Sequence, residues 1–268
     1  MPVKGIHRYN KLLQNIDNPA EYIFRKKNRF HRNLQFTTRP NPIKFEVPIL
    51  LYPVFKEIFL EDVYDIQILL PKLGNAPKII DVGANAGYFD YLLLSKNSNA
   101  TIYAFEPLPG NIKQINNTVK ANSKILQKLI VEDKAVTGNS TEPLTLFVEK
   151  ATESVIASMH DNFDKRNQQK IEVFTIPFYS IFDKYDLRVV DLLKMDCEGA
   201  EYDIFYKTPI EYLQRIKIIV LEVHDLNNED ENLSAISKFL TKANFTIKSV
   251  PINGFCHAVT AFNNLFAK

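Results

Sequence analysis

Apolar strand-like runs and amphipathic helix-like segments alternate along this chain from residue 78 to about residue 262. A short apolar run bounded by turn residues indicates a buried strand, and an amphipathic segment after it indicates a helix that carries the chain back. Repeated alternation of this kind places parallel strands in one sheet and helices on both of its faces. The sequence therefore predicts an α/β sandwich built around a parallel sheet.

The same patterns give the expected bounds of the elements. Strands are predicted at Lys78–Val82, Thr101–Phe105, Leu129–Val131, Leu144–Glu149, Val189–Met195 and Ile216–Val223. Helices are predicted at Tyr88–Lys96, Gly110–Asn122, Pro177–Tyr185 and Glu229–Ala243, with one or two more within 49–72 and a polar loop over 150–170. Phe245–Val250 and His257–Phe262 are expected to close the fold as a hairpin around Asn253-Gly254.

Positive charge is concentrated near the amino terminus. Residues 1–45 contain ten lysines and arginines against two acidic residues, a net charge of +8, whereas the remaining residues carry a net charge of −6. We therefore expect a basic N-terminal extension over 1–45 and one α/β domain over 46–268. The extension either meets phosphates, acidic glycans or a membrane surface, or packs on the domain through its aromatic residues, which are Tyr22, Phe24, Phe30 and Phe36.

Cysteine content and hydropathy limit the cellular compartments in which such a chain is expected. Two cysteines, Cys197 and Cys256, are too few for a disulfide framework, which favours a reducing environment. Residues 1–30 contain no apolar stretch of signal-peptide length, and no apolar run approaches the roughly 20 residues of a membrane span. We expect a cytoplasmic protein without a transmembrane segment.

The few glycines lie where backbone could meet a ligand. The chain has 8 glycines, whereas average usage would give roughly 19 in this length. Gly83 and Gly87 share the turn after one predicted strand, and Gly199 follows another. Glycine permits positive φ and a close approach of backbone to a ligand. A binding site is therefore predicted at the carboxyl ends of these strands.

The residues around the first turn indicate a nucleoside without phosphates. Glu106, twenty-five residues after Asp81 and at the end of the next strand, is placed to accept hydrogen bonds from both ribose hydroxyls. Asn85 stands where a dinucleotide-binding loop needs glycine, and the loop has no basic residue to bind a phosphate. A cationic nucleoside such as S-adenosylmethionine suits this loop.

A second group of polar residues follows two further strands. Asp196 and Glu198 come directly after the strand at Val189–Met195. Glu222 and His224 end the strand at Ile216–Val223 and share one side of it, because side chains alternate along a strand. We expect all four groups to converge at one edge of the sheet.

Three motifs together resemble a known family. Asp81–Phe89 (DVGANAGYF), Glu106–Asn111 (EPLPGN) and Leu193–Glu201 (LKMDCEGAE) are similar to signatures of the FkbM family of S-adenosylmethionine-dependent methyltransferases. The resemblance covers roughly residues 45–262, with the motifs in the expected order and spacing. It implies the class I methyltransferase fold, a three-layer Rossmann-like sandwich whose seven-stranded, mostly parallel sheet ends in a C-terminal antiparallel hairpin.

The resemblance also implies roles for individual residues. Gly83, Asn85 and Gly87 would surround the methionine part of the cofactor, with Asp81 near its amino group. Glu106 and Asp196 would also contact the cofactor, Asp133 or the backbone of 134–135 would lie beside adenine, and Tyr64 would cover the cofactor or pack on the sheet. The implied acceptor-binding residues are Ser154, Ser158, His160 and Glu198.

The acidic cluster leaves three interpretations open. A hydroxyl acceptor must lose its proton, which calls for a general base, and Asp196 is the first candidate with His224 and Glu222 beside it. The same carboxylates and imidazole could instead hold a divalent cation that acidifies the hydroxyl. Alternatively the cluster is structural, with Glu198 and Glu201 capping the helix that follows.

These observations predict an S-adenosylmethionine-dependent O-methyltransferase that acts on a small-molecule or glycan acceptor, such as a carbohydrate, glycolipid or related natural product. One alternative is an RNA methyltransferase that grips phosphates with residues 1–45. The chain lacks a recognised RNA-binding signature there, so a nucleic-acid partner is not expected. The other alternative is a protein that binds the cofactor without catalysis.

Overall fold

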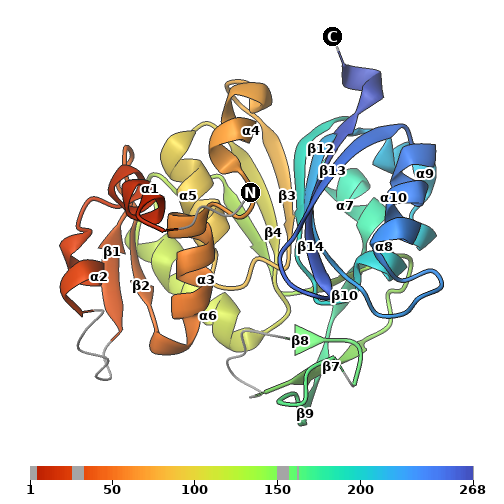
Figure 1. Cartoon of the computed structure of the whole chain (residues 1–268), viewed down its shortest axis with the longest axis horizontal. Coiled ribbons are helices and arrows are strands. Elements are labelled where there is room, and N and C mark those ends of the chain that lie inside the picture. Colours follow the sequence, from red (N-terminus) through yellow and green to blue (C-terminus); the bar gives the residue numbers. More distant parts are fainter. Residues whose placement is uncertain (1–4, 26–32, 150–156, 162, 268) are drawn as a thin grey trace.

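The computed structural model describes residues 5–25, 33–149, 157–161 and 163–267 (Figure 1). At its centre is a seven-stranded sheet in the order β13-β14-β12-β11-β3-β4-β5. Its strands are β3 (Lys78–Val82), β4 (Thr101–Phe105), β5 (Leu129–Glu132), β11 (Val190–Met195), β12 (Ile216–His224), β13 (Phe245–Pro251) and β14 (Cys256–Asn263).

Pairing in this sheet is parallel from β5 through β4, β3 and β11 to β12, and antiparallel where β14 joins β12 and β13. The predicted α/β sandwich with a mostly parallel sheet and a C-terminal antiparallel hairpin is therefore confirmed. The strand order reverses between β3 and β11, where a sheet of this kind binds its ligands.

Alternate residues of the strands face two separate helical layers. Ile79, Ile102 and Leu192 belong to the core on one face, which holds α5 (Tyr88–Lys96) and α6 (Pro109–Ala121). Ile80 and Leu193 belong to the core on the other face. That face is covered by α7 (Phe178–Lys184), α8 (Glu201–Lys207) and α10 (Leu233–Lys242), and α9 (Ile210–Leu213) adds Leu213 to it. Period-two alternation of buried side chains thus makes the sheet the middle layer.

The N-terminal region adds to the first of these cores. It contains α1 (His7–Asn15), α2 (Ala20–Arg25) and an antiparallel pair of strands, β1 (Leu34–Thr37) and β2 (Lys44–Val47). Phe36 on β1 stacks on Phe55 with ring centroids 4.4 Å apart, and Phe45 on β2 stacks on Phe59 at 5.2 Å. Of the two arrangements considered for this region, the structure shows packing on the domain through aromatic residues.

The four aromatic residues expected to pack differ in their surroundings. Tyr22 and Phe36 are buried, Phe24 is exposed, and Phe30 lies outside the described residues. Two of the basic residues form ion pairs, Lys11 with Asp62 at 2.7 Å and Arg39 with Asp17 at 2.6 Å. Part of the positive charge of this region is therefore compensated within the chain.

The apolar segment at 49–73 forms several short helical pieces instead of one or two helices. They are η1 (Ile49–Leu51), α3 (Tyr52–Lys56), the π-helical η2 (Glu57–Glu61) and α4 (Ile66–Leu73). Asp62 and Asp65 adopt left-handed backbone conformations, with φ of 51° each, so the chain turns sharply between η2 and α4. π-Helical turns are often found beside functional sites, and this one brings Glu57 to a pocket described below.

The region predicted as a loop over 150–170 contains strands that the sequence pattern did not reveal. β7 (Leu144–Val148) lies in a separate three-stranded sheet, where it pairs antiparallel with β8 (Ala157–Ser158) and β9 (Gln169–Val173). β6 (Ala135–Thr137) pairs with β10 (Thr175–Pro177). β9 is too polar to be recognised alone, and its extended form depends on its ladder with β7. A short η3 (Asn264–Phe266) follows β14. No helix in the described part of the chain has both the length and the apolar character needed to cross a membrane.

Candidate active site

Two adjoining pockets lie at the carboxyl ends of the central strands. The first is bounded by the ends of β3, β4 and β11 together with Ala157 and Met159 of the small sheet. The second is bounded by β12, the β13–β14 turn, η2 and residues 163–166. Gly83, Asn85, Asp196 and Glu198 line both pockets. A molecule in one pocket would therefore meet a molecule in the other at these four residues.

Gly83 allows the two strand ends to approach each other. Its φ is +80°, and a Cβ atom there would stand 1.9 Å from the carbonyl oxygen of Asp196. The backbone N–H of Asp196 donates to the carbonyl of Val82 at 3.0 Å. Only glycine tolerates both constraints, so the scarce glycine at this position fixes the junction of the pockets.

Glu106 is buried at the end of β4 and fixed by three donors. Its carboxylate accepts hydrogen bonds from the backbone N–H of Asn85 at 2.8 Å, the backbone N–H of Leu108 at 2.9 Å and Nδ2 of Asn111 at 3.2 Å. Burial raises the pKa of Glu106 to about 7, although these hydrogen bonds lower it. The ribose-binding position predicted from the sequence is thus held rigidly at the wall of the first pocket.

The rest of the first pocket is mainly apolar beyond Glu106. Its apolar lining includes Leu108, Ala135, Val136, Leu144 and Leu146. Of its charged residues three are acidic (Glu106, Asp196 and Glu198) and one is basic (Lys134). Asp133 lines a separate groove beside Pro109 and Phe174. Of the two positions considered for adenine, the structure places 134–135, and not Asp133, in this pocket.

A buried ion pair supports the floor of the site. Lys194 on β11 lies 3.0 Å from Oδ1 of Asp81 on β3 and donates to the carbonyl of Gly83 at 2.6 Å. Burial raises the pKa of Asp81 although Lys194 opposes the shift, and the pKa of buried Asp90 is raised by burial and by the charge of Asp81. Asp81 therefore lies beneath the loop, where it pairs with Lys194. It is not among the residues that line either pocket.

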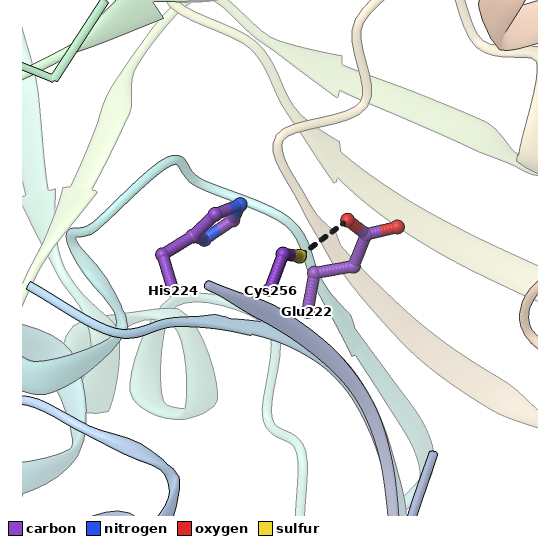
Figure 2. Close-up of side chains that lie close together, drawn as sticks. All are labelled: Glu222, His224 and Cys256. Atoms are coloured by element: carbon purple, nitrogen blue, oxygen red, sulfur yellow. Dashed lines mark hydrogen bonds between the residues drawn. The ribbon is translucent and has the colours of Figure 1, made fainter. Parts of the chain in front are cut away.

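Tyr64 connects two of the predicted acidic residues. Its hydroxyl donates to Oδ2 of Asp196 at 2.9 Å and lies 3.4 Å from Oε1 of Glu222. The ring lines the second pocket, edge-on to Phe89. Glu222 also accepts a hydrogen bond from Sγ of Cys256 at 3.4 Å (Figure 2). Tyr64 thus fixes the orientation of these carboxylates in the second pocket.

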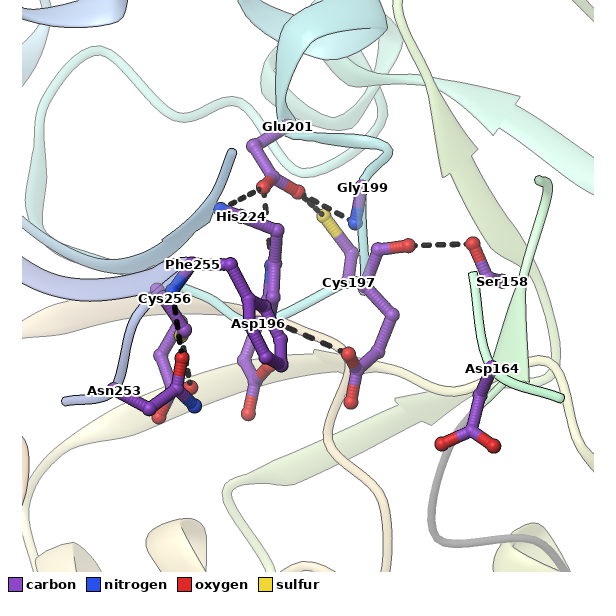
Figure 3. A network of polar contacts seen from close by, with 12 residues as sticks. Ser158, Asp164, Asp196, Cys197, Gly199, Glu201, His224, Asn253, Phe255 and Cys256 are labelled. Carbon is purple, nitrogen blue, oxygen red and sulfur yellow. Dashed lines mark hydrogen bonds and ion pairs between the residues drawn. The ribbon is translucent and has the colours of Figure 1, made fainter. Parts of the chain in front are cut away.

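His224 lies between two carboxylates (Figure 3). Its Nδ1 is 3.1 Å from Oε1 of the fully buried Glu201, and its Nε2 is 3.3 Å from Oε2 of Glu198. Burial lowers the pKa of His224, but contacts with Cys256, Glu201 and Glu198 outweigh it and raise this pKa to about 12. Glu201, for which helix capping was one of the open interpretations, also accepts hydrogen bonds from the backbone N–H groups of Gly199 and His224 at 2.9 Å each.

Several carboxylates share the second pocket. Burial and the charge of Asp196 raise the pKa of Glu57 to about 7 and those of Glu198 and Glu222 to about 8. The expected convergence of Asp196, Glu198, Glu222 and His224 is therefore present. Glu57 joins them from η2, and no sequence pattern had singled this residue out.

The residues expected to bind the acceptor are only partly in place. Ser158 is fully buried and donates to the carbonyl of Glu198 at 2.6 Å, and Nε2 of His160 lies 3.4 Å from the carbonyl of Gly199. Both support the turn after β11 and are not among the pocket lining. Ser154 lies outside the described residues.

Other side chains that the sequence analysis missed also line the second pocket. They are Phe163, Asp164, Arg166, Asn253 and Phe255. The Asn253-Gly254 turn signal located the hairpin tip, but nothing in the pattern showed that this tip lies over the site. Lys194 interrupts the apolar run of β11, and this interruption was its one signal in the sequence.

Comparison with known proteins identifies the class. Residues 81–247 match the family model described as the methyltransferase FkbM domain. The chain is 26% identical over 193 residues to methyltransferase sdnD of Sordaria araneosa, covering 63% of this chain and 73% of that protein. It is 27% identical to methyltransferase 1 of Beauveria bassiana, covering 71% and 79%.

Among solved structures, the precorrin-6y C5,15-methyltransferase of Geobacter metallireducens is similar in fold alone. The identity is 14% and the TM-score 0.43, with 74% of this chain and 87% of that chain covered. The sheet order and the match to the FkbM domain together define a Rossmann-like methyltransferase, for which the family and fold imply S-adenosylmethionine as cofactor. The chain belongs to the FkbM methyltransferase family.

Proposed function

We propose that this protein transfers a methyl group from S-adenosylmethionine to a hydroxyl group of a carbohydrate, glycolipid or related natural product. The observation that carries this proposal is the junction of two pockets at Gly83, Asn85, Asp196 and Glu198. Methyl transfer requires two molecules in line, and positioning them is the main contribution that an enzyme makes to such a displacement.

The chemistry of the first pocket fits the cofactor. Three carboxylates against one lysine suit a cationic sulfonium, the apolar walls suit an adenine ring, and Glu106 would hold the ribose hydroxyls. When bound, the cofactor supplies an electrophilic methyl group. The backbone at Gly83 and Asn85 would contact its methionine part, as proposed from the family resemblance.

The second pocket fits a polar acceptor. Asn253 offers hydrogen-bonding groups, Asp164 and Arg166 line the same pocket as an ion pair at 2.7 Å, and the rings of Phe163 and Phe255 offer faces for the carbon skeleton of a sugar. Asp196, oriented by the hydroxyl of Tyr64, would take the proton from the acceptor hydroxyl. We place His224 beside this step and not in it, because both of its ring nitrogens face carboxylates.

Binding of S-adenosylhomocysteine tests the first pocket. Saturating ligand is expected to raise the melting temperature, by linkage between binding and folding. A mass-spectrometric search for products heavier by one CH2 group, with polyol and glycolipid fractions as acceptors, tests the transfer. An unchanged melting temperature at saturating ligand would contradict the cofactor site, and tight binding without turnover on any acceptor would favour a non-catalytic binding protein.

The affinity for S-adenosylhomocysteine is expected to depend on the ionisation of Glu106. Because its pKa is about 7, lowering the pH from 8 to 6 should weaken binding by up to about tenfold as the protonated group loses an acceptor site. Glu106→Gln should weaken binding by about 10- to 100-fold at pH 8, since a hydrogen bond to a charged group contributes about 1.5–3 kcal/mol. Isothermal titration of both proteins across this range checks it. A pH profile that persists in the variant would assign the titration to another group.

A further inference from the structure

We propose that Glu222, His224 and Cys256 form a zinc site in the acceptor pocket. The three side chains offer a carboxylate oxygen, an imidazole nitrogen and a thiol sulfur, and these atoms lie within 4.8 Å of one another (Figure 2). All three residues line the second pocket. The site shares no residue with the four that join the two pockets.

Strand pairing brings the three groups together. Glu222 and His224 are alternate residues at the end of β12, so their side chains leave the same face of the sheet. Cys256 begins β14 and is paired with His224 in the antiparallel register. Groups held by two paired strands are positioned more precisely than groups on loops, which is what a metal site requires.

The neighbouring residues orient the ligands. Glu201 is fully buried and lies 3.1 Å from Nδ1 of His224, so the ring presents Nε2 to the pocket. There Nε2 lies 3.3 Å from Oε2 of Glu198, a contact that a bound ion would replace. Metal-binding histidines commonly donate their second ring N–H to a carboxylate in this manner. The hydroxyl of Tyr64 lies 3.4 Å from Oε1 of Glu222. The other carboxylate oxygen of Glu222, Oε2, contacts Sγ of Cys256.

The donor set favours zinc over magnesium or calcium. A thiolate and an imidazole are ligands that zinc prefers, whereas the harder ions prefer oxygen alone. Tetrahedral Zn–S and Zn–O bonds of about 2.3 and 2.1 Å require a sulfur and an oxygen roughly 3.5 Å apart, and Sγ of Cys256 lies 3.4 Å from Oε2 of Glu222. Three protein ligands leave a fourth position for an acceptor, as in catalytic zinc sites, and Oε2 of Glu198, 3.3 Å from Nε2 of His224, stands beside that position.

The role of such an ion rests on the proposed function. An acceptor hydroxyl bound at the open position would become more acidic. Its O–H bond would break, its proton would pass to Asp196, and its oxygen would keep the electron pair. Asp196 and Glu222 are both contacted by the hydroxyl of Tyr64, so the proton acceptor stands beside the metal ligand.

Cobalt substitution tests the site directly. Metal-free protein, prepared by dialysis against a chelator, is titrated with Co2+ and followed by absorption. We expect one equivalent to bind with visible bands of tetrahedral cobalt and a near-ultraviolet thiolate-to-cobalt band, and Zn2+ to displace it. Cys256→Ser should abolish the thiolate band. Cys197→Ser is the matched control, because it removes the other cysteine, which lines the first pocket, and should keep the band.

The remaining variants separate this site from its neighbour. Glu201→Gln should weaken Zn2+ binding by about 10- to 100-fold, the usual effect of losing an orienting carboxylate. Asp196, Glu198 and His224 form an overlapping group of possible ligands. Co2+ binding without a thiolate band and lost in Asp196→Asn would overturn the proposal in favour of that group, and the absence of any stoichiometric binding would overturn it altogether. Stabilisation by S-adenosylhomocysteine, measured on the same samples, reports separately on the proposed function.

Discussion

Asp196→Asn is expected to reduce the rate of methyl transfer by about 10²- to 10⁴-fold, the range in which a positioned general base contributes. The amide keeps the shape of the side chain and its contact with the hydroxyl of Tyr64, at 2.9 Å in the native protein, but cannot take a proton. Binding of S-adenosylhomocysteine should change less than the rate, because Asp196 lines the first pocket but the proposed ribose and adenine regions are untouched. Initial rates of methylated product, measured by mass spectrometry beside ligand affinity, check both expectations.

Asp191→Asn is the matched control for this change. Asp191 lies on β11, the strand that Asp196 follows, at the end opposite the pockets, where it pairs with Lys217 at 2.7 Å. Its replacement should leave the rate within twofold of the native protein. If Asp196→Asn retains nearly full rate while the control behaves as expected, the proton acceptor is another group. If both variants lose activity equally, the effect is one of folding.

Lys194→Met is expected to lower the free energy of unfolding by about 3–5 kcal/mol, the usual cost of removing one partner from a buried ion pair. The Lys194–Asp81 pair is almost completely inaccessible, with side-chain exposures of 4% and 0%. Its loss leaves the carboxylate of Asp81 beside buried Asp90 without a cation, and removes the hydrogen bond to the carbonyl of Gly83. Urea denaturation at neutral pH measures the effect.

Lys217→Met provides the comparison that makes this prediction specific. Its ion pair with Asp191 is as short, but the two side chains are 38% and 16% exposed, so its loss should cost only about 0–1 kcal/mol. Equal destabilisation by the two variants would show that burial does not determine the cost.

The destabilisation by Lys194→Met should also increase as the pH rises. Burial raises the pKa of Asp81 in the folded protein, and loss of Lys194 raises it further, so the folded variant retains a proton that the unfolded chain has lost. Stability therefore falls with increasing pH from the unfolded pKa, near 4, up to the folded one. Denaturation at pH 5 and pH 8 measures this slope, and a pH-independent effect would exclude Asp81 as its origin.

The fold could be predicted because its signals are local. The apolar runs at Lys78–Val82 and Thr101–Phe105 agree with β3 and β4 residue for residue. The helix at Tyr88–Lys96 agrees equally well. β9 could not be predicted in the same way, since its polar residues gain their extended conformation from pairing with β7. Local pattern finds elements that carry their own apolar face and misses those that a neighbour imposes.

The residues of the candidate site likewise fall into those that the sequence could indicate and those that only the assembled fold brings in. Gly83, Glu106 and Asp196 follow buried strands directly, so chain order alone placed them at one edge of the sheet, and their roles remain predictions. Glu57 comes from an irregular helical turn on the other side of the pocket, where no sequence pattern singles it out. From the sequence, Ser158 was a candidate for binding the acceptor, but its hydroxyl donates a hydrogen bond to the carbonyl of Glu198.

The sequence by itself determined that strands and helices alternate and that glycine and acidic residues collect where those strands end, because periodicity and chain order are properties of the chain. Only the tertiary structure decided which distant groups meet there. The strand register sets Cys256 opposite His224, and the packing of β11 against β3 sets Lys194 beside Asp81. Both contacts join segments far apart in sequence, so they arise only when the sheet is assembled.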